Sequence, residues 1–433
     1  MANFNFGFQK NDAQERVLLV ALIRPFRNKI EITESLVELA LLAESANGVV
    51  IDKIIQERPR VDPATFIGKG KAHEVASIVH SLKVNTVIFD EDLTPAQVFN
   101  LEKIIKRNII DRTGLILDIF AKHARTREAK TQVELAQLNY LLPSLTGRWS
   151  HFSRQEGGIG LRGPGETQLE TDRRLVRKRI VKLREDLNHI EKQRVNRYKG
   201  RKSIFKAALI GYTNAGKSTV MNALTKANVL VEDKLFATLD STVRKMSVSS
   251  KQYILLSDTV GFIKKLPHHL IASFHSTLGE VREADLLVHV VDFSHPGYKE
   301  QIDAVNDVLL ILELQDKSVL LVFNKLDLVN DSEKIDQART EYPDAIFISA
   351  KRELGLVRLT NTIHQCAVKD YQEFHVTILL EEQAAQFAVI KRHFEIMETT
   401  YEDSVVHVRL RGNRKMIGTV KGILDMVKVD AVE

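Results

Sequence analysis

The segment GYTNAGKS, from Gly211 to Ser218, places glycine, lysine and serine at a spacing that suits phosphate binding. It matches the pattern G-x-x-x-x-G-K-[ST], in which glycines let backbone N–H groups curl around a phosphate at a helix N-terminus. In that geometry Lys217 reaches the β- and γ-phosphates, and the Ser218 hydroxyl can ligate Mg²⁺. An ordinary glycine-rich turn is the alternative, and further motifs decide between them. The predicted phosphate-binding residues are Gly211, Tyr212, Thr213, Asn214, Ala215, Gly216, Lys217 and Ser218.

A second motif, D-x-x-G, lies forty residues after Ser218 and comprises Asp258, Thr259, Val260 and Gly261. Its aspartate can hold Mg²⁺ through a water molecule, and the Gly261 N–H can sense a γ-phosphate. The motif carries no weight alone, but this order along the chain makes it informative.

Between these two motifs lies a candidate switch segment, FATLD. Thr238 is the candidate for a second protein ligand to Mg²⁺, beside Ser218. Thr242 has the same side chain, and spacing alone does not separate the two. The residues of the segment are Phe236, Ala237, Thr238, Leu239 and Asp240.

Base recognition is predicted by the motifs NKLD and SAK, which follow two later apolar runs. The Asp327 carboxylate can accept hydrogen bonds from guanine N1–H and its 2-amino group, whereas adenine would leave this charge unpaired. Asn324 can bridge the loop and the purine edge, and the SAK loop can direct a backbone N–H at guanine O6. The predicted base-binding residues are Asn324, Lys325, Leu326, Asp327, Ser349, Ala350 and Lys351.

Two alternating β/α patterns must position these motifs. In residues 17–123, β-branched runs alternate with helical periods, which indicates a parallel sheet covered by helices. A second such pattern occupies 204–368, and the last 65 residues follow the order β-α-β-β-α. The predicted strands are 17–23, 49–55, 84–90, 108–112, 205–211, 243–249, 253–258, 286–293, 319–324, 345–350, 374–380, 395–401 and 405–411, and the predicted helices are 34–46, 72–82, 95–107, 126–142, 166–199, 382–394 and one from about Asn413.

The region between these patterns is unusual in both glycine and charge. Residues 157–165 contain five glycines, so this loop cannot pack a core and must be mobile or held by a partner. Residues 173–206 contain fourteen Arg and Lys against three Asp and Glu, although the whole chain carries a net charge of only +6. Such concentrated positive charge favours contact with nucleic-acid phosphates, while a solvated helix face is the alternative.

Composition excludes several classes of protein. The chain is 44% hydrophobic and 27% charged, which is typical of folded domains rather than disorder. A single cysteine, Cys366, rules out a disulfide framework and a cysteine-cluster metal site. No apolar run approaches the ~18 residues of a membrane helix, and the N-terminus does not resemble a secretory signal. We therefore expect a cytoplasmic protein with no integral membrane association, monomeric when free.

The motifs GYTNAGKS, FATLD, DTVGF, NKLD and SAK together resemble the HflX-type GTPases, within the Obg-like translational GTPases. The stretch GGIGLRGPGETQLETDRR, residues 157–174, is similar to a signature specific to that family. The resemblance favours Thr238 over Thr242 as the switch ligand to Mg²⁺. It also implies binding to the large (50S) ribosomal subunit and its rRNA, and action on stalled or idle ribosomes in a bacterial cytoplasm. The candidate RNA-binding residues are Arg162, Arg173, Arg174, Arg177, Lys178 and Arg179.

We expect a multidomain α/β fold with four parts: an N-terminal α/β domain (1–155), a glycine-rich loop and basic helical linker (156–202), a P-loop GTPase domain (203–368) and a small α+β domain (369–433). The expected function is Mg²⁺-dependent hydrolysis of GTP to GDP, coupled to ribosome splitting, rescue or assembly control. The residues assigned to catalysis are Lys217, Thr238 and Gly261.

Alternatives remain open at this stage. The chain could be an RNA-remodelling protein that uses ATP in its N-terminal domain, since Gly68–Lys71 (GKGK) could bind phosphate, although a turn before a helix also explains that segment. A membrane-associated signalling GTPase lacks support from any lipidation motif.

Two positions bear on how the attacking water is activated. Phe262 stands where many GTPases have a water-orienting glutamine, so we expect it to be a hydrophobic anchor. Asn214 could hold K⁺ near the β–γ bridge, or form a loop-shaping hydrogen bond.

Overall fold

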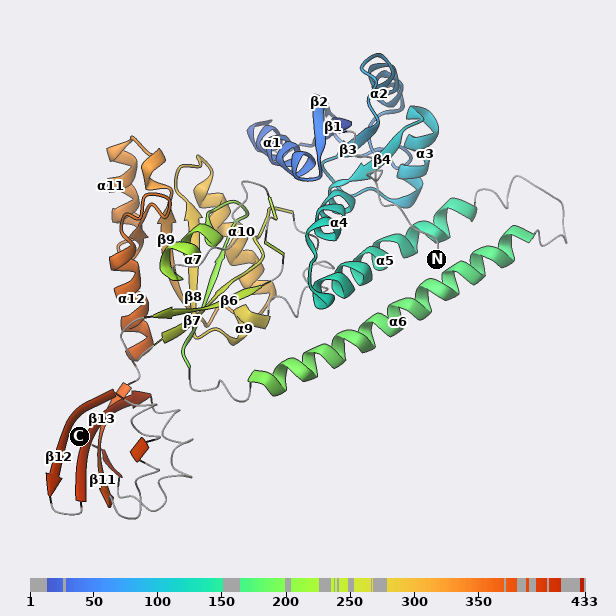
Figure 1. Cartoon of the computed structure of the whole chain (residues 1–433). Helices are drawn as coiled ribbons and strands as arrows, with labels where there is room; N and C mark the ends of the chain where they lie inside the picture. The colour runs from blue at the N-terminus through green and yellow to red at the C-terminus, as the bar shows by residue number, and fades with distance from the viewer. Residues whose placement is uncertain are drawn as a thin grey trace.

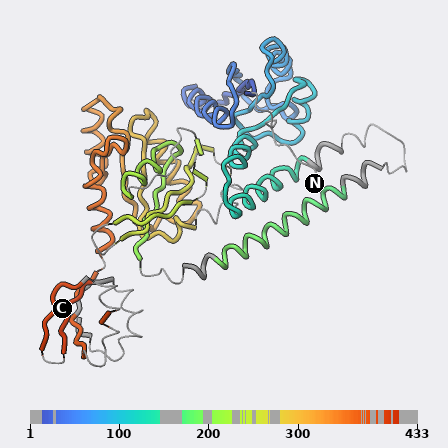
Figure 2. Tube along the Cα trace, in the orientation of Figure 1, coloured from blue at the N-terminus to red at the C-terminus, as the bar shows by residue number. Residues whose placement is uncertain are grey.

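The computed structural model of the 433-residue chain describes residues 14–25, 29–150, 164–198, 204–225, 235–236, 238–239, 241–247, 253–265, 267, 279–369, 371–379, 387–388, 395–402, 405–413 and 429–431. Figure 2 follows the trace from an N-terminal α/β unit through two long helices and a second α/β unit to a small sheet. Arg162, Ala237, Asp240 and most of the glycine-rich loop lie outside the described residues. Among the described helices, none is long and apolar enough to cross a membrane.

The N-terminal sheet is parallel, with strand order β2-β1-β3-β4. Residues Val17 to Leu22 of its inner strand β1 are at most 1% exposed, because helices cover both faces of the sheet. Helices α1, α4 and α5 (Arg127–Ser150) pack on one face, and α2 and α3 pack on the other. The elements are β1 (Glu15–Ile23), α1 (Lys29–Ser45), β2 (Gly48–Glu57), α2 (Lys69–Ser81), β3 (Thr86–Phe89), α3 (Pro95–Ile105), β4 (Asn108–Asp111) and α4 (Arg112–His123).

These elements confirm the predicted β/α alternation, with one omission. Helix α3 begins with a capping box, in which Thr94 and Gln97 bond each other's backbone N–H groups, and Pro95 stands in its first turn. Helix α2 begins directly after Gly68, so the GKGK segment lies at a helix start. Helix α4 was not predicted; it begins at the residue after β4, where the Asp111 carboxylate caps it by accepting from the Gly114 N–H at 2.8 Å.

Two long helices, α5 (Arg127–Ser150) and α6 (Pro164–Tyr198), run side by side in opposite directions (Figure 1). Leu135 of α5 packs with Val176, Ile180 and Leu183 of α6, so the two helices form a hairpin. This seam occupies a narrow stripe of α6, so most of its charged side chains remain exposed.

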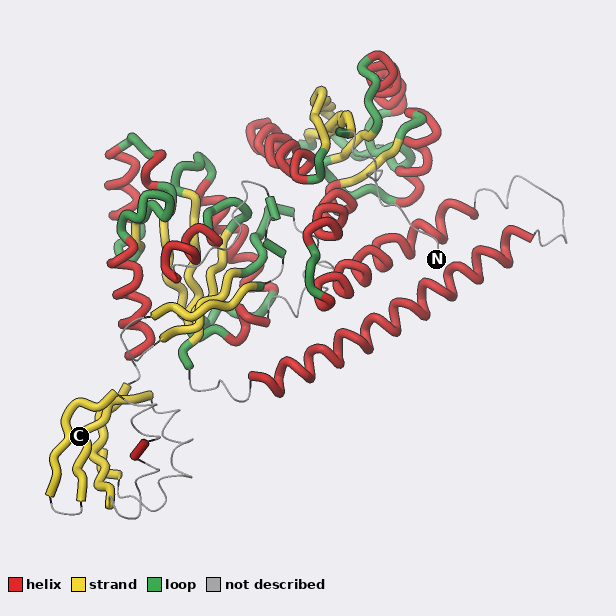
Figure 3. The backbone as a smooth tube through the Cα atoms, in the orientation of Figure 1, coloured by secondary structure: helices red, strands yellow, loops and turns green. Residues whose placement is uncertain are grey.

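The second α/β unit has a mixed six-stranded sheet, order β10-β9-β8-β5-β7-β6, in which β6 is antiparallel. Helices α7 and α12 cover one face, and α9 and α10 cover the other (Figure 3). The carboxyl ends of β5, β7 and β9 carry the three sequence motifs. The elements are β5 (Lys206–Gly211), α7 (Lys217–Thr225), β6 (Thr242–Ser247), β7 (Tyr253–Asp258), α9 (Gly279–Glu283), β8 (Leu286–Asp292), α10 (Tyr298–Ile311), β9 (Ser318–Asn324), η2 (Leu326–Leu328), α11 (Ser332–Glu341), β10 (Ile346–Phe347) and α12 (Leu356–Val368).

The C-terminal sheet is antiparallel, with order β12-β13-β11-β14, and lies beyond α12 in Figure 1. Its three longer strands were predicted, whereas the three-residue β14 was not. The predicted helix 382–394 is described only at 387–388, and the last predicted helix falls largely outside the described residues. The strands are β11 (Tyr371–Leu379), β12 (Glu395–Glu402), β13 (Val405–Asn413) and β14 (Val429–Ala431).

Candidate active site

The phosphate loop joins β5 to α7 and is shaped by two glycines with positive φ. At Gly211 (φ +146°) a Cβ would stand 2.1 Å from the Val290 carbonyl oxygen, and at Gly216 (φ +91°) it would stand 2.4 Å from Asn324 Nδ2. A side chain at either position would therefore collide with its neighbour. Gly211 and Gly216 are therefore required, because their backbone conformation and close neighbours leave no room for a side chain.

Lys217 lies in the first turn of α7, and its side chain folds back across the loop. Nζ donates to the carbonyl oxygens of Gly211 at 3.2 Å and Tyr212 at 2.8 Å. Burial lowers the pKa of Lys217 to about 8, because the charged ammonium loses its hydration. A bound phosphate would supply negative charge at this place and favour the protonated amine.

Three oxygen-bearing side chains meet at the start of α7. Ser218 Oγ lies 3.0 Å from Thr238 Oγ1 and donates to Asp258 Oδ2 at 2.5 Å. Thr238 therefore lies beside the loop serine, whereas Thr242 begins β6 as the strand partner of Asp258. This geometry favours Thr238 over its competitor.

The Asp258 carboxylate is an unusual group to bury. It is 0% exposed, and its Oδ1 has no hydrogen-bond partner among the described residues. Burial raises the pKa of Asp258, against the opposing effect of the Lys217 charge. A divalent cation held by the neighbouring hydroxyls would favour the ionised carboxylate, so this donor set of hard oxygens fits Mg²⁺.

Gly261 brings the second motif against the phosphate loop. The Thr213 N–H donates to the Phe262 carbonyl at 2.8 Å, and the Phe262 N–H donates to the Gly211 carbonyl at 3.1 Å. A Cβ on Gly261 would approach Lys217 Nζ to 3.0 Å, so a side chain here would crowd the space above the lysine. Phe262 is 2% exposed and packs with the core of the sheet.

The base-recognition motifs are tied directly to the phosphate loop. Asn324 uses both ends of its amide: Nδ2 donates to the Ala215 carbonyl at 2.9 Å, and Oδ1 accepts from the Ala350 N–H at 3.0 Å. Asn324 therefore joins the phosphate loop to the SAK loop. The contact with the phosphate loop is one half of the bridge that we expected from Asn324, and its contact with the purine edge stays a prediction.

Asp327 lies in the short helix η2, directly after β9, and its side chain is 7% exposed. It accepts a hydrogen bond from Ser349 Oγ, which lowers the pKa of Asp327 below its ordinary value, with Arg352 and Lys351 adding favourable charge. Lys325 is anchored by an ion pair with Asp292 at 2.7 Å. The structure thus brings together the described residues of all the motifs at one edge of the sheet.

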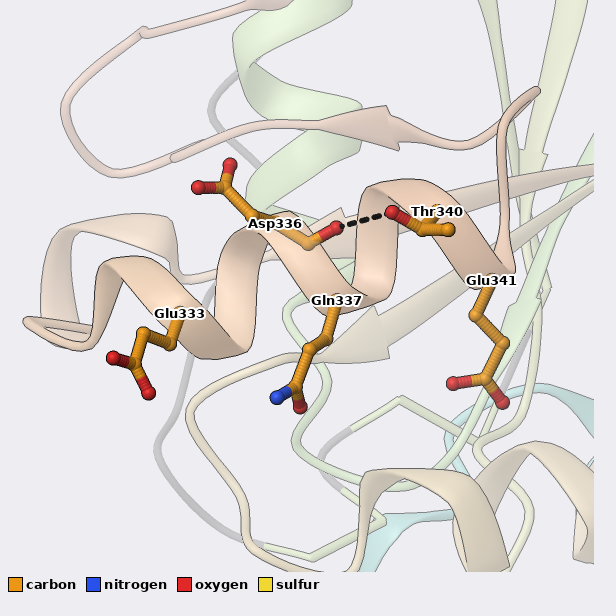
Figure 4. A pocket seen from close by; sticks show the side chains of 5 residues that line it. All are labelled: Glu333, Asp336, Gln337, Thr340 and Glu341. Carbon is orange, nitrogen blue, oxygen red and sulfur yellow. Dashed lines mark hydrogen bonds between the residues drawn. The ribbon is translucent and has the colours of Figure 1, made fainter.

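A surface depression along α11 lies outside this arrangement (Figure 4). None of its lining residues belongs to a nucleotide motif, and they all come from one helix, which makes it a feature of that helix surface. The lining residues are Glu333, Asp336, Gln337, Thr340 and Glu341.

Sequence reasoning missed a group of N-terminal residues that contact the site. Tyr212 of the phosphate loop donates its hydroxyl to Glu38 of α1, and the ring of Phe236 packs edge-on against Phe120 of α4 at 4.7 Å. The partners are separated by more than 100 residues along the chain, so no local pattern could have indicated them. An aromatic residue inside the switch segment was the one available signal.

Comparison with known proteins shows which families this chain resembles. Three family profiles match: "GTP-binding GTPase N-terminal" at residues 33–121, "GTP-binding GTPase Middle Region" at 123–201 and "50S ribosome-binding GTPase" at 206–325. A GTP-binding protein from Sulfolobus solfataricus, solved with GDP, is 26% identical with a TM-score of 0.45, covering 82% of this chain and 99% of that chain.

Curated relatives extend the match over most of the chain. GTPase HflX of Flavobacterium psychrophilum is 51% identical over 72% of this chain and 76% of its own length. GTPase HflX of Escherichia coli is 46% identical over 81% of this chain and 83% of its own length. The chain therefore belongs to the HflX family of GTPases, enzymes that hydrolyse GTP.

Proposed function

We propose that this GTPase uses Mg²⁺ and acts on the large ribosomal subunit, in ribosome splitting, rescue or assembly control in a bacterial cytoplasm. The observation that carries the ribosomal part is the exposed basic face of α6. The match of residues 206–325 to a profile described as a 50S ribosome-binding GTPase supports the same partner. The free protein is proposed to be monomeric.

The basic face follows from how α6 packs. Its apolar seam is turned toward α5, which leaves Arg174, Arg177 and Lys178 exposed on the rest of the helix. Arg179 differs, because its guanidinium donates twice to the Glu134 carboxylate of α5, at 2.7 and 2.8 Å. We therefore assign phosphate contact to these three exposed residues and hairpin stabilisation to Arg179, while the half-buried Arg173 stays a candidate for phosphate contact.

The proposed metal ligands are the hydroxyls of Ser218 and Thr238, with Asp258 acting through water. Bound Mg²⁺ would neutralise charge that develops on the β- and γ-phosphate oxygens. Lys217 and the backbone N–H groups of the phosphate loop would add to this stabilisation, and the Gly261 N–H is our candidate for bonding the γ-phosphate.

The attacking water needs a different arrangement from that of glutamine-bearing GTPases. Phe262 is buried and its ring offers no strong hydrogen bond, so it anchors the segment rather than orienting water. We infer that the ribosomal partner completes the site by ordering the segments around Thr238 and Gly261. Asn214 has a positive φ of 60° within the phosphate loop, where its amide oxygen is our candidate for holding K⁺.

Co-sedimentation with separated ribosomal subunits tests this proposal. With a non-hydrolysable GTP analogue, we expect the protein to pellet with large subunits, less with GDP, and not with small subunits. Asp327→Asn, tested with the same analogue, should lose the nucleotide-dependent part of the binding. Equal pelleting with both subunits, or none with either, would contradict the proposed partner.

A further inference from the structure

The segment that carries Thr238 is buried against the N-terminal domain. Leu235, Phe236 and Leu239 are at most 5% exposed and belong to the same apolar cluster as side chains of α1, α4 and α5. The Leu235 N–H also donates to Ser45 Oγ of α1 at 3.1 Å. Residues of a nucleotide switch therefore form part of the core of a different domain.

Phe236 shows how firmly this segment is held. Its φ is +57°, a left-handed conformation that an aromatic residue rarely adopts. Such a conformation persists when the surroundings over-determine it, and here the Phe120 ring packs against Phe236 at 4.7 Å. Two residues later, Thr238 Oγ1 lies 3.0 Å from Ser218 Oγ. The contact with Phe120 thus supports the position of the predicted metal ligand.

The segment after Gly261 is held by charges. Lys265 Nζ donates to Asp90 and, at 3.0 Å, to Ser35 Oγ. Arg112 donates to the same carboxylate at 2.9 Å and to Glu38, and it reaches the Lys264 carbonyl at 3.3 Å. The side chains of Asp90 and Arg112 are each 2% exposed. Withdrawal of Lys265 would leave a buried carboxylate with one cationic partner fewer, which is costly.

The phosphate loop joins the same network through Tyr212. Its hydroxyl donates to Glu38 and accepts from the Lys264 N–H at 2.7 Å. One N-terminal cluster thus contacts the phosphate loop and the segment after Gly261. Movement of either element disturbs hydrogen bonds made by the other.

The cluster of Asp90, Arg112 and Glu38 lies at the edge of the N-terminal sheet where ligands commonly bind. Asp90 follows the carboxyl end of β3, beside β1, and the strand order β2-β1-β3-β4 reverses direction between these two strands. In open α/β sheets a ligand binds at this reversal point, outside the carboxyl ends of the strands. Here Lys265 of the same chain occupies it (Figure 1 shows the two units adjacent).

We propose that the N-terminal domain is a clamp that selects the triphosphate state, with Phe120 and Asp90 as positioning residues for Thr238 and the Gly261 segment. The proposal rests on the nucleotide site proposed above and is independent of ribosome binding. Docking of the clamp and binding of a γ-phosphate both require the same placement of the two segments, so each favours the other. GDP makes no contact that needs this placement.

Binding of a non-hydrolysable GTP analogue and of GDP to the full chain, measured by calorimetry, tests the clamp. Lys265→Gln should weaken analogue binding roughly 5- to 150-fold, the usual range of allosteric coupling. GDP binding should change less than about twofold, a small effect on that scale. Lys265→Arg should restore part of the difference. Lys265 lies outside the N-terminal domain and its side chain is 30% exposed, so Lys265→Gln leaves every side chain of that domain in place.

Three further variants sharpen the test. Phe120→Leu removes the ring contact while keeping an apolar side chain, and it should lower the analogue-to-GDP affinity ratio. Glu34→Gln, an exposed position one turn before Glu38 on α1, is the matched control and should leave the ratio unchanged. In a double-mutant cycle, Asp90→Asn and Lys265→Gln should be non-additive, since they remove the same contact.

Hydrogen exchange supplies a readout that a merely structural contact would not give. Peptides from α4 should exchange more slowly with the analogue than with GDP, and Lys265→Gln should abolish that difference. If all clamp variants shift both affinities equally, or shift neither, the N-terminal domain is a fixed attachment and the proposal fails. If the wild-type protein binds neither the analogue nor GDP, the proposed nucleotide site itself is wrong.

Discussion

At Asp327, a carboxylate oxygen accepts a hydrogen bond from Ser349 while Arg352 lies 3.8 Å away. These neighbours keep the group ionised and oriented, as the low pKa of Asp327 requires. A negative charge fixed at this place suits two N–H donors on one edge of a purine, which guanine offers and adenine does not. We therefore expect base choice to depend on the charge of the Asp327 side chain.

Asp327→Asn should weaken GTP binding on the order of 100-fold. The two charge-assisted hydrogen bonds to guanine would be lost, and the new Asn amide N–H donors would face the N–H donors of guanine. Xanthine carries a carbonyl where guanine has its 2-amino group, so xanthosine triphosphate should become the preferred ligand. Competition binding with both nucleotides measures the change. Asp336→Asn, an exposed carboxylate on α11, is the control; unchanged GTP affinity in Asp327→Asn would rule out the assigned pocket.

The two switch threonines can be separated in the same way. Thr238→Ala should lower Mg²⁺-dependent affinity for a GTP analogue by at least about tenfold, since even outer-shell changes at metal sites cost this much. GDP affinity should stay near the wild-type value, because the ligand serves the triphosphate state. Thr242→Ala is the matched control, being a strand residue opposite Asp258. Titration of Mg²⁺ against each variant measures this affinity. An equal loss of Mg²⁺-dependent analogue affinity in Thr238→Ala and Thr242→Ala would contradict the assignment of Thr238 as a metal ligand.

A helix, strand or loop could be predicted from the sequence where its conformation is determined by neighbouring residues in the chain, and not where it is determined by contacts between distant segments. The phosphate loop could be predicted because its backbone demands glycine at Gly211 and Gly216. Helix α4 was missed because nine consecutive residues, from Arg112 to Phe120, are buried, so it shows no polar face, and it follows β4 without a turn. The contact of Arg112 with Lys264 joins residues 152 positions apart and leaves no trace in either segment.

The basic face of α6 makes a prediction about salt. Neutralising Arg173, Arg174, Arg177 and Lys178 to Gln should weaken binding to large subunits and flatten its salt dependence. Each lost phosphate contact removes about 0.7–0.9 from the slope of log K against log salt concentration. Arg179→Gln should instead loosen the α5–α6 hairpin, because it breaks the pair with Glu134 and leaves the slope nearly unchanged. Nucleotide binding should be the same in all variants.

A charge-matched control separates place from total charge. Changing four exposed lysines of the N-terminal domain to Gln removes the same charge from a different surface; these are Lys53, Lys69, Lys103 and Lys106. Binding measured from 50 to 200 mM salt should keep the wild-type slope in this variant. If the two sets flatten the slope equally, α6 acts through net charge and is only a solvated spacer.

For the whole molecule, the clamp and the basic hairpin are parts of one continuous chain path. Helix α4 contacts the Gly261 segment through Arg112 and is followed by α5, which packs on α6. A partner that binds α6 would therefore contact the α5–α6 hairpin, which is joined directly to α4 of the proposed clamp. We propose that this connection would couple a ribosomal subunit bound at α6 to Thr238 and Gly261, so stimulated turnover is the property to measure.

Turnover should be slow for the protein alone and much faster with large subunits. Phe262 is buried and its ring offers no strong hydrogen bond to the attacking water, so we expect that water to be ordered by segments that a partner stabilises. If Asn214 holds K⁺ at the β–γ bridge, replacing K⁺ with Na⁺ should lower the stimulated rate, and Asn214→Ala should make the two cations equivalent. Phosphate release is measured with and without large subunits, in K⁺ and in Na⁺, which gives four rates for each protein. Fast turnover in Na⁺ without subunits would refute both the partner-activated mechanism and the potassium site, because water would then be ordered by the chain unaided.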